Sequence, residues 1–209
     1  MSAEDRNMQD LEAALGYRFR DREWLRTALT PPSTGLTPNN QRLEYLGDAV
    51  LQLAVSELIY RVQVACGISA KVILVTLQKE QGLTTSSAPS DWNLRAAMGA
   101  SCPDTEPCDP AYSGVGPQIV QGVRQLKIYK AGKFAKQPGV NFIGYNPNSA
   151  CGGTNINIQN YATAALYNYT PYQPNAAALK NMAGEGDACS AYGNRNFWRL
   201  FNIWFGSTH

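Results

Sequence analysis

Residues 69–83 read Ser-Ala-Lys-Val-Ile-Leu-Val-Thr-Leu-Gln-Lys-Glu-Gln-Gly-Leu. The apolar side chains recur at helical spacing, a serine can cap the start, and a glycine can end the helix in a left-handed conformation. The stretch therefore predicts a helix from Ser69 to Gln81. Glu80 follows Ile73 by seven residues and Leu77 by three, so it shares their apolar face.

Glu80 is the first candidate catalytic residue. A carboxyl group held among apolar side chains at a helix end can act as a general acid and protonate a glycosidic oxygen. The alternative is a partly exposed glutamate at a polar helix end. Asp91 and Asp104 are candidates for a second carboxylate, and each could equally be a helix cap or a loop acid.

A second informative stretch, residues 40–51, reads Asn-Gln-Arg-Leu-Glu-Tyr-Leu-Gly-Asp-Ala-Val-Leu. It opens a long predicted helix, residues 42–61, on which Glu44 and Asp48 share one face because they lie four positions apart. Such a pair can hold Mg²⁺, which activates water and neutralises developing charge in phosphodiester hydrolysis. The alternative is that both are solvated residues of an amphipathic helix.

Composition changes sharply along the chain. Residues 1–63 contain seven Arg, no Lys and nine acidic residues, whereas residues 64–209 contain seven Lys, four Arg and seven acidic residues. All five cysteines lie in the second part. We predict two domains, residues 1–63 and 67–209, joined at 64–66. A natural fusion, a misassembled gene and a deliberately built chimera would all produce such a sequence.

The two parts suggest different compartments. The charged, cysteine-free first part suits the cytosol, and the second part has the Asn, Gly, Tyr and Cys usage of an exported domain. No signal peptide or stretch of 18 apolar residues is evident, so we expect a cytoplasmic protein without a membrane span. The only histidine is His209, which excludes catalytic triads and histidine-rich metal sites.

The first part resembles the ribonuclease III family. Residues 40–51 are similar to its signature, and residues 15–19 and 25–30 to its opening helices. The resemblance implies that Glu44 is a metal ligand and Asp48 the catalytic aspartate of a Mg²⁺-dependent homodimer that cuts double-stranded RNA.

This sequence departs from the family where the metal site should be completed. The family places a second Asp and Glu on a later helix, and neither is found. Residues 91–100 are the nearest look-alike, but Leu94 stands where the Glu is needed. No double-stranded RNA-binding domain follows. We therefore expect a truncated three-helix fragment with an incomplete site, since two carboxylates alone bind Mg²⁺ weakly.

Residues 67–209 resemble a lysozyme-like domain of exported actinobacterial proteins labelled hemagglutinin or cell-wall hydrolase. The similar runs are residues 72–83, 164–174 and 192–198. The resemblance implies an α-rich, α+β domain in which Glu80 acts on peptidoglycan without a cofactor. Gln118, Tyr169 and Tyr172 are candidates for positioning the sugar.

Cysteine spacing suggests two disulfides, Cys102–Cys108 and Cys151–Cys189, with Cys66 left over; free thiols in a cytosolic product are the alternative. We expect the aromatic series of residues 197–205 to lie in the core because it follows one helix face. The tyrosines of residues 161–172 are better candidates for stacking on sugars.

The overall prediction is a mainly α chain. Further helices are expected at residues 10–16, 21–29, 91–98, 118–130, 156–168, 175–182 and 194–205, with a hairpin at 134–145. Three functions remain open: a peptidoglycan hydrolase that uses Glu80, a Mg²⁺-dependent ribonuclease III-type endonuclease that uses Glu44 and Asp48, and a non-catalytic fusion product.

Overall fold

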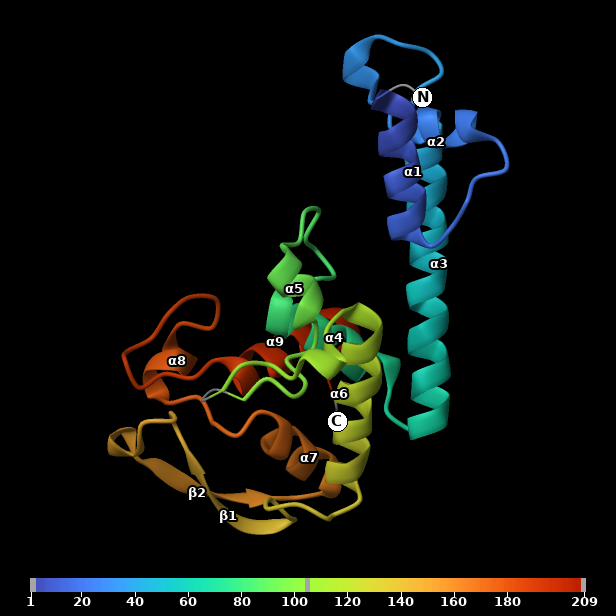
Figure 1. Ribbon diagram of the computed structural model, residues 1–209. Coiled ribbons are helices and arrows are strands. Elements are labelled where there is room, and N and C mark those ends of the chain that lie inside the picture. Colours follow the sequence, from blue (N-terminus) through green and yellow to red (C-terminus); the bar gives the residue numbers. More distant parts are fainter. Residues whose placement is uncertain (1–2, 104–105, 208–209) are drawn as a thin grey trace. The chain divides into compact units, whose positions relative to one another are not determined.

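The computed structural model of the protein describes residues 3–103 and 106–207, and it is mainly helical with one small sheet (Figure 1). The chain divides into two compact units, Met1–Ser56 and Glu57–His209. Each unit has its own packing and is described by itself.

The smaller unit contains α1 (Ala3–Leu15), α2 (Arg22–Ala28) and the first part of α3 (Gln41–Cys66). Three helices were predicted in this region, although α1 begins well before residue 10. Among the side chains that the structure describes in this unit, Met8 and Leu25 are the buried apolar ones. Large apolar side chains remain exposed at Leu15, Tyr17, Trp24, Leu29, Leu36, Tyr45, Leu46, Val50, Leu51 and Leu53. The unit therefore buries little apolar surface for its size.

Glu12 joins α1 to the segment that leads into α2. Its Oε1 accepts a hydrogen bond from the Phe19 backbone N–H at 3.0 Å, and its Oε2 pairs with the Arg22 guanidinium at 2.9 Å. Burial raises the pKa of Glu12, but these bonds and the nearby arginines outweigh it and leave the pKa below its usual value. This carboxylate is thus a structural group.

Helix α3 is long and apolar enough, by length and composition alone, to cross a membrane. This is weak evidence, because the core helix of a soluble protein can pass the same test. The sequence predicts no membrane span, whereas α3 satisfies the length and hydropathy criterion for one.

The last ten residues of α3, from Glu57 onward, belong to the larger unit. Ile59 and Val62 are buried, and the Ala65 carbonyl accepts a hydrogen bond from Lys127 Nζ at 3.2 Å. The Gln63 side chain accepts a bond from the Ala70 backbone N–H at 2.9 Å. These contacts fix the start of α4 against the end of α3.

Helix α4 (Ala70–Gln81) is the predicted central helix of the larger unit. The Ser69 side chain caps its first turn, and Gly82 ends it with a φ of 67°. The side chains of Ile73 and Val75 are fully buried. Helix α4 packs against α9 (Gly193–Phe205).

Four further helices complete the larger unit: α5 (Asp91–Arg95), α6 (Val115–Lys130), α7 (Tyr161–Tyr169) and α8 (Ala176–Lys180). Helix α6 packs against α7. The most deeply buried apolar side chains of the larger unit come from α4, α6, α7, the sheet and the loop after α5. They are Ile73, Val75, Met98, Ile119, Val123, Ile143, Ile158 and Ala164. This core holds α4, α6 and the sheet together.

The sheet differs from the sequence prediction. Strand β1 (Gly139–Gly144) pairs antiparallel with β2 (Gly153–Ile158). Only β1 lies within the hairpin predicted at 134–145, and β2 occupies part of the helix predicted at 156–168. The alternation Asn-Ile-Asn-Ile at residues 155–158 is a strand pattern of period two. It turns Ile158 into the core, 2% exposed, so the helix begins only at Tyr161.

The structure contains the disulfides Cys102–Cys108 and Cys151–Cys189, which span 6 and 38 residues of sequence. Cys66 carries a free thiol. The longer bridge joins the turn that precedes β2 to the segment between α8 and α9. It therefore ties the sheet to the C-terminal part of the unit.

The unequal loop lengths lead to a stability prediction for the oxidised protein. Because a longer loop loses more chain entropy on closure, the Cys151→Ser/Cys189→Ser variant should lose about 4 kcal/mol, and Cys102→Ser/Cys108→Ser about 2 kcal/mol. Urea denaturation followed by circular dichroism measures both losses. Equal losses, or the reverse order, would contradict the loop-length argument.

Candidate functional site

Glu80 lies in the last turn of α4, and its side chain is 27% exposed. A Cβ atom added at Gly99 would lie 3.2 Å from the Glu80 carboxyl group, so the loop backbone at Gly99 approaches this carboxyl closely. Gly99 has a φ of 65°, a conformation that favours glycine. The carboxyl is thus confined on one side and partly open to solvent on the other.

The loop Met98–Ser101 is held in place by Gln118 on α6. The Gln118 side chain is 1% exposed, and its Oε1 accepts hydrogen bonds from the backbone N–H groups of Met98 and Ala100 at 3.2 and 3.0 Å. Its Nε2 donates to the carbonyl groups of Ala100 and Tyr112 at 2.8 and 2.9 Å. One buried amide therefore satisfies four backbone groups of irregular chain.

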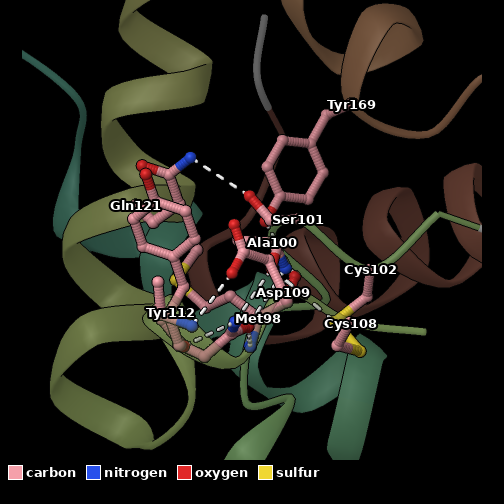
Figure 2. The surroundings of a disulfide bond; sticks show 11 residues. Met98, Ala100, Ser101, Cys102, Cys108, Asp109, Tyr112, Gln121 and Tyr169 are labelled. Carbon is pink, nitrogen blue, oxygen red and sulfur yellow. Dashed lines mark hydrogen bonds between the residues drawn. A yellow bond between two sulfur atoms is a disulfide. The ribbon is translucent and has the colours of Figure 1, made fainter. Parts of the chain in front are cut away.

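Two further side chains reach the same loop, and Figure 2 shows both in the surroundings of the Cys102–Cys108 disulfide. Tyr169 of α7 donates its hydroxyl to the Met98 carbonyl at 2.7 Å, and Gln121 donates to Ser101 Oγ at 3.1 Å. Burial, with the nearby Glu80 carboxylate, raises the pKa of Tyr169. Its hydroxyl therefore remains a neutral hydrogen-bond donor.

These contacts give Gln118 and Tyr169 roles other than the predicted positioning of sugar. Gln118 is buried and uses all its side-chain polar groups on the backbone, so it cannot reach a substrate. The Tyr169 hydroxyl points into the loop. Tyr172 is half-buried beside Gly144 of β1, and its carbonyl accepts a bond from Asn194 at 2.8 Å. Both tyrosines join elements of the fold.

Lys79 is the residue of this region that the sequence patterns missed. Its ammonium group forms an ion pair with Glu80, yet its side chain is only 4% exposed. Adjacent helix residues do not normally face each other, so no spacing rule predicts this pair. The one feature of the sequence that could have indicated this pair is a lysine next to a glutamate at the end of an otherwise apolar helix.

Of the two candidate second carboxylates, Asp91 begins α5, where its side chain is 88% exposed and pairs with Arg95 at 3.6 Å. It behaves as an acidic residue of a first helical turn. Asp104 lies outside the residues that the structure describes. Neither provides an established partner for Glu80.

A separate cavity of about 690 Å³ lies between the start of α4 and helices α6, α7 and α9. Tyr167, Trp198 and Phe201 contribute aromatic surface to its lining. The core prediction for the α9 aromatics is right for Phe197, which is 7% exposed, and wrong for Trp198, which is 59% exposed. Several polar residues of the lining already serve the fold. For example, Asn160 caps α7.

In the smaller unit, Glu44 and Asp48 are exposed and lie four residues apart on α3. Glu44 accepts a hydrogen bond from Asn40 Nδ2 at 2.9 Å. Within residues 3–103 and 106–207, no group of three or more His, Cys, Asp or Glu residues could hold a metal ion. Two exposed carboxylates alone supply too few ligands for Mg²⁺.

Comparison with known proteins supports the resemblance of a short segment to ribonuclease III. The chain is 58% identical over 50 residues to Ribonuclease 3 of Helicobacter acinonychis, which is 24% of this chain and 21% of that protein. It is 46% identical over 56 residues to Ribonuclease 3 of Campylobacter concisus, covering 27% and 25% respectively. The chain thus spans about a quarter or less of these relatives.

No family model matches the chain, and no solved structure matches it. The comparisons therefore provide no support for the predicted likeness of residues 67–209 to lysozyme-like cell-wall hydrolases.

The buried amide of Gln118 leads to a second stability prediction. In Gln118→Leu, four backbone groups lose their partner in the interior, which should lower the free energy of unfolding by about 3 kcal/mol or more. Gln121→Leu on the same helix loses one hydrogen bond and should cost about 1 kcal/mol. Urea unfolding measures both. Equal destabilisation by the two variants would show that the loop does not depend on Gln118.

Proposed function

We propose that the larger unit is a glycoside hydrolase that cleaves peptidoglycan-type glycans with Glu80 as its general acid. The observation that carries this proposal is the Glu80 carboxyl group, which is partly open to solvent and held between α4 and the loop at Gly99. A carboxyl group fixed at a partly open position can serve as the general acid, one of the two groups that glycosidic bond cleavage uses.

In the proposed reaction, the protonated form of the Glu80 carboxyl donates its proton to the glycosidic oxygen as the bond from that oxygen to the anomeric carbon breaks. Water then adds to the anomeric carbon, and its released proton restores the Glu80 carboxyl. The contacts of the neighbouring loop serve this step by keeping the carboxyl in one place. No metal ion or other cofactor enters the scheme.

The test of this proposal is cleavage of purified bacterial cell walls by the oxidised protein in the presence of EDTA. Glu80→Gln keeps the size and hydrogen bonding of the side chain but cannot donate a proton. It should lower the rate of fragment release about 100-fold or more. Glu185→Gln changes an exposed glutamate of the same unit and should have no effect. Equal release by Glu80→Gln and the wild type would refute the role of Glu80.

A ribonuclease III-type endonuclease is the second candidate, favoured by the 58% identical segment. In this proposal Glu44 and Asp48 bind Mg²⁺, the substrate is double-stranded RNA, and the protein acts as a homodimer. The carboxylates present do not fit a complete magnesium site, so no catalytic step is derived through the metal.

This second candidate predicts that millimolar Mg²⁺ supports cutting of double-stranded RNA, that EDTA abolishes it, and that Asp48→Asn lowers it about 100-fold or more. Gel analysis of a labelled duplex provides the measurement. If the wild-type protein leaves the duplex intact, the endonuclease is rejected. Failure of both assays would leave a non-catalytic fusion product.

A further inference from the structure

The cavity between α4, α6, α7 and α9 is separate from the surroundings of Glu80. All of its lining residues belong to the larger unit, and neither Glu80 nor Gly99 is among them. Its volume of about 690 Å³ is comparable to that of pockets that hold small organic molecules. The cavity can therefore be considered as a binding site that does not depend on the proposed general acid.

The inner wall of the cavity is apolar. Ile68, Leu126, Ala165 and Phe197 line the cavity and are themselves buried. Trp198 also lines the cavity, and its large exposed fraction places it toward the opening. Removing apolar ligand surface from water against such a wall is favourable. The wall therefore favours a ligand with an apolar body.

The asparagine side chains of the lining largely serve the fold. Asn194 Nδ2 donates to the carbonyl groups of Thr170 and Tyr172 at 2.7 and 2.8 Å. Asn202 Nδ2 donates to the Trp198 carbonyl at 2.7 Å. A sugar that leaves water needs hydrogen-bond partners for its hydroxyl groups. The lining is therefore better suited to a hydrocarbon chain than to a glycan.

Lys130 gives the edge of the cavity a positive charge. Of the described residues that line the cavity, Lys130 is the charged one and none is acidic. Its side chain is exposed, and its Nζ donates to the Gly67 carbonyl at 3.3 Å. It forms no ion pair with any side chain that the structure describes. An anionic group at the opening would therefore meet a cation that has no competing carboxylate.

We propose that this cavity binds a fatty acid, with the hydrocarbon chain against the apolar inner wall and the carboxylate at the Lys130 ammonium group. This inference does not depend on the proposed hydrolase function. A second copy of the chain or a glycan could also cover an apolar cavity. The isolated positive charge at the edge of an apolar interior favours a single-chain anion over both.

Isothermal titration calorimetry of the full oxidised chain with dodecanoate, below its critical micelle concentration, tests the proposal. We expect one dodecanoate per chain, and about tenfold weaker binding of decanoate because two fewer CH₂ groups are buried. Lys130→Met should weaken decanoate binding about tenfold and change the binding of uncharged decanol less than about twofold. Lys127→Met is the matched control. Lys127 is exposed on the same helix and donates to the Ala65 carbonyl, but it does not line the cavity, so its variant should bind as the wild type does.

The variant Ala162→Trp tests the location of the site. Ala162 is an exposed lining residue of α7, so a tryptophan there should obstruct the cavity and weaken the binding of both decanoate and decanol more than about tenfold. Thermal denaturation checks its folding. Should it fail to fold, a dodecanoate that carries a diazirine in its chain replaces this test, and it should label residues 160–167 or 194–202 of the wild type. Labelling elsewhere overturns the proposal.

Three other results would also overturn the proposal. The first is absence of dodecanoate binding by the wild type, and the second is equal weakening by Lys127→Met and Lys130→Met. The third is another occupant without dodecanoate binding: a dimer that Ala162→Trp converts to monomers, or an N-acetylglucosamine oligomer that this variant no longer binds.

Discussion

The amide of Gln118 is the interaction on which the rest of the candidate site depends. In the loop Met98–Ser101, Met98 and Ala100 are buried but the backbone has no regular hydrogen-bonding pattern, so its groups need partners from side chains. From within the core, Gln118 supplies three of these bonds and a fourth to the Tyr112 carbonyl. Because the loop is fixed in this way, Gly99 can stand against the Glu80 carboxyl and the Met98 carbonyl can receive Tyr169. The site is therefore built from the core outward.

The two units differ in how much of their apolar surface they bury, and this difference bears on function. The larger unit encloses residues of α4, α6 and the sheet in one core and can hold a carboxyl group in a defined place. The smaller unit leaves most apolar side chains of its part of α3 exposed, and its similarity extends over only about a quarter or less of the ribonucleases that it resembles. A metal site needs several ligands held rigidly together, and the described part of the chain brings no such group together.

Helix α3 shows how packing can differ from composition. The charge pattern changes near residue 63, yet the larger unit begins at Glu57 and includes Ile59 and Val62 in its buried surface. A helix can continue through a change of composition because its backbone bonds are local, while its side chains pack with whichever residues surround them. The residues of α3 from Glu57 onward thus pack with the larger unit, for example through the hydrogen bond from Lys127 of α6 to the Ala65 carbonyl.

The sequence by itself determined features whose physical causes lie within a few residues. The serine cap, the apolar spacing and the terminal glycine define α4, and the residue 40–51 motif marks the similarity to ribonuclease III. The alternation of polar and apolar residues at 155–158 also indicated a strand, although the helical spacing of the residues that follow led to the prediction of a helix there.

Only the tertiary structure decided which groups meet. It turned Gln118 into the core, exposed Trp198, and brought Lys79 to both Glu80 and Thr170, 91 residues further along the chain. Caps and periodicity act through short-range sterics and hydrogen bonds, so they can be read from the sequence. The partner of a buried polar group depends on how distant elements pack, and no local pattern contains that information.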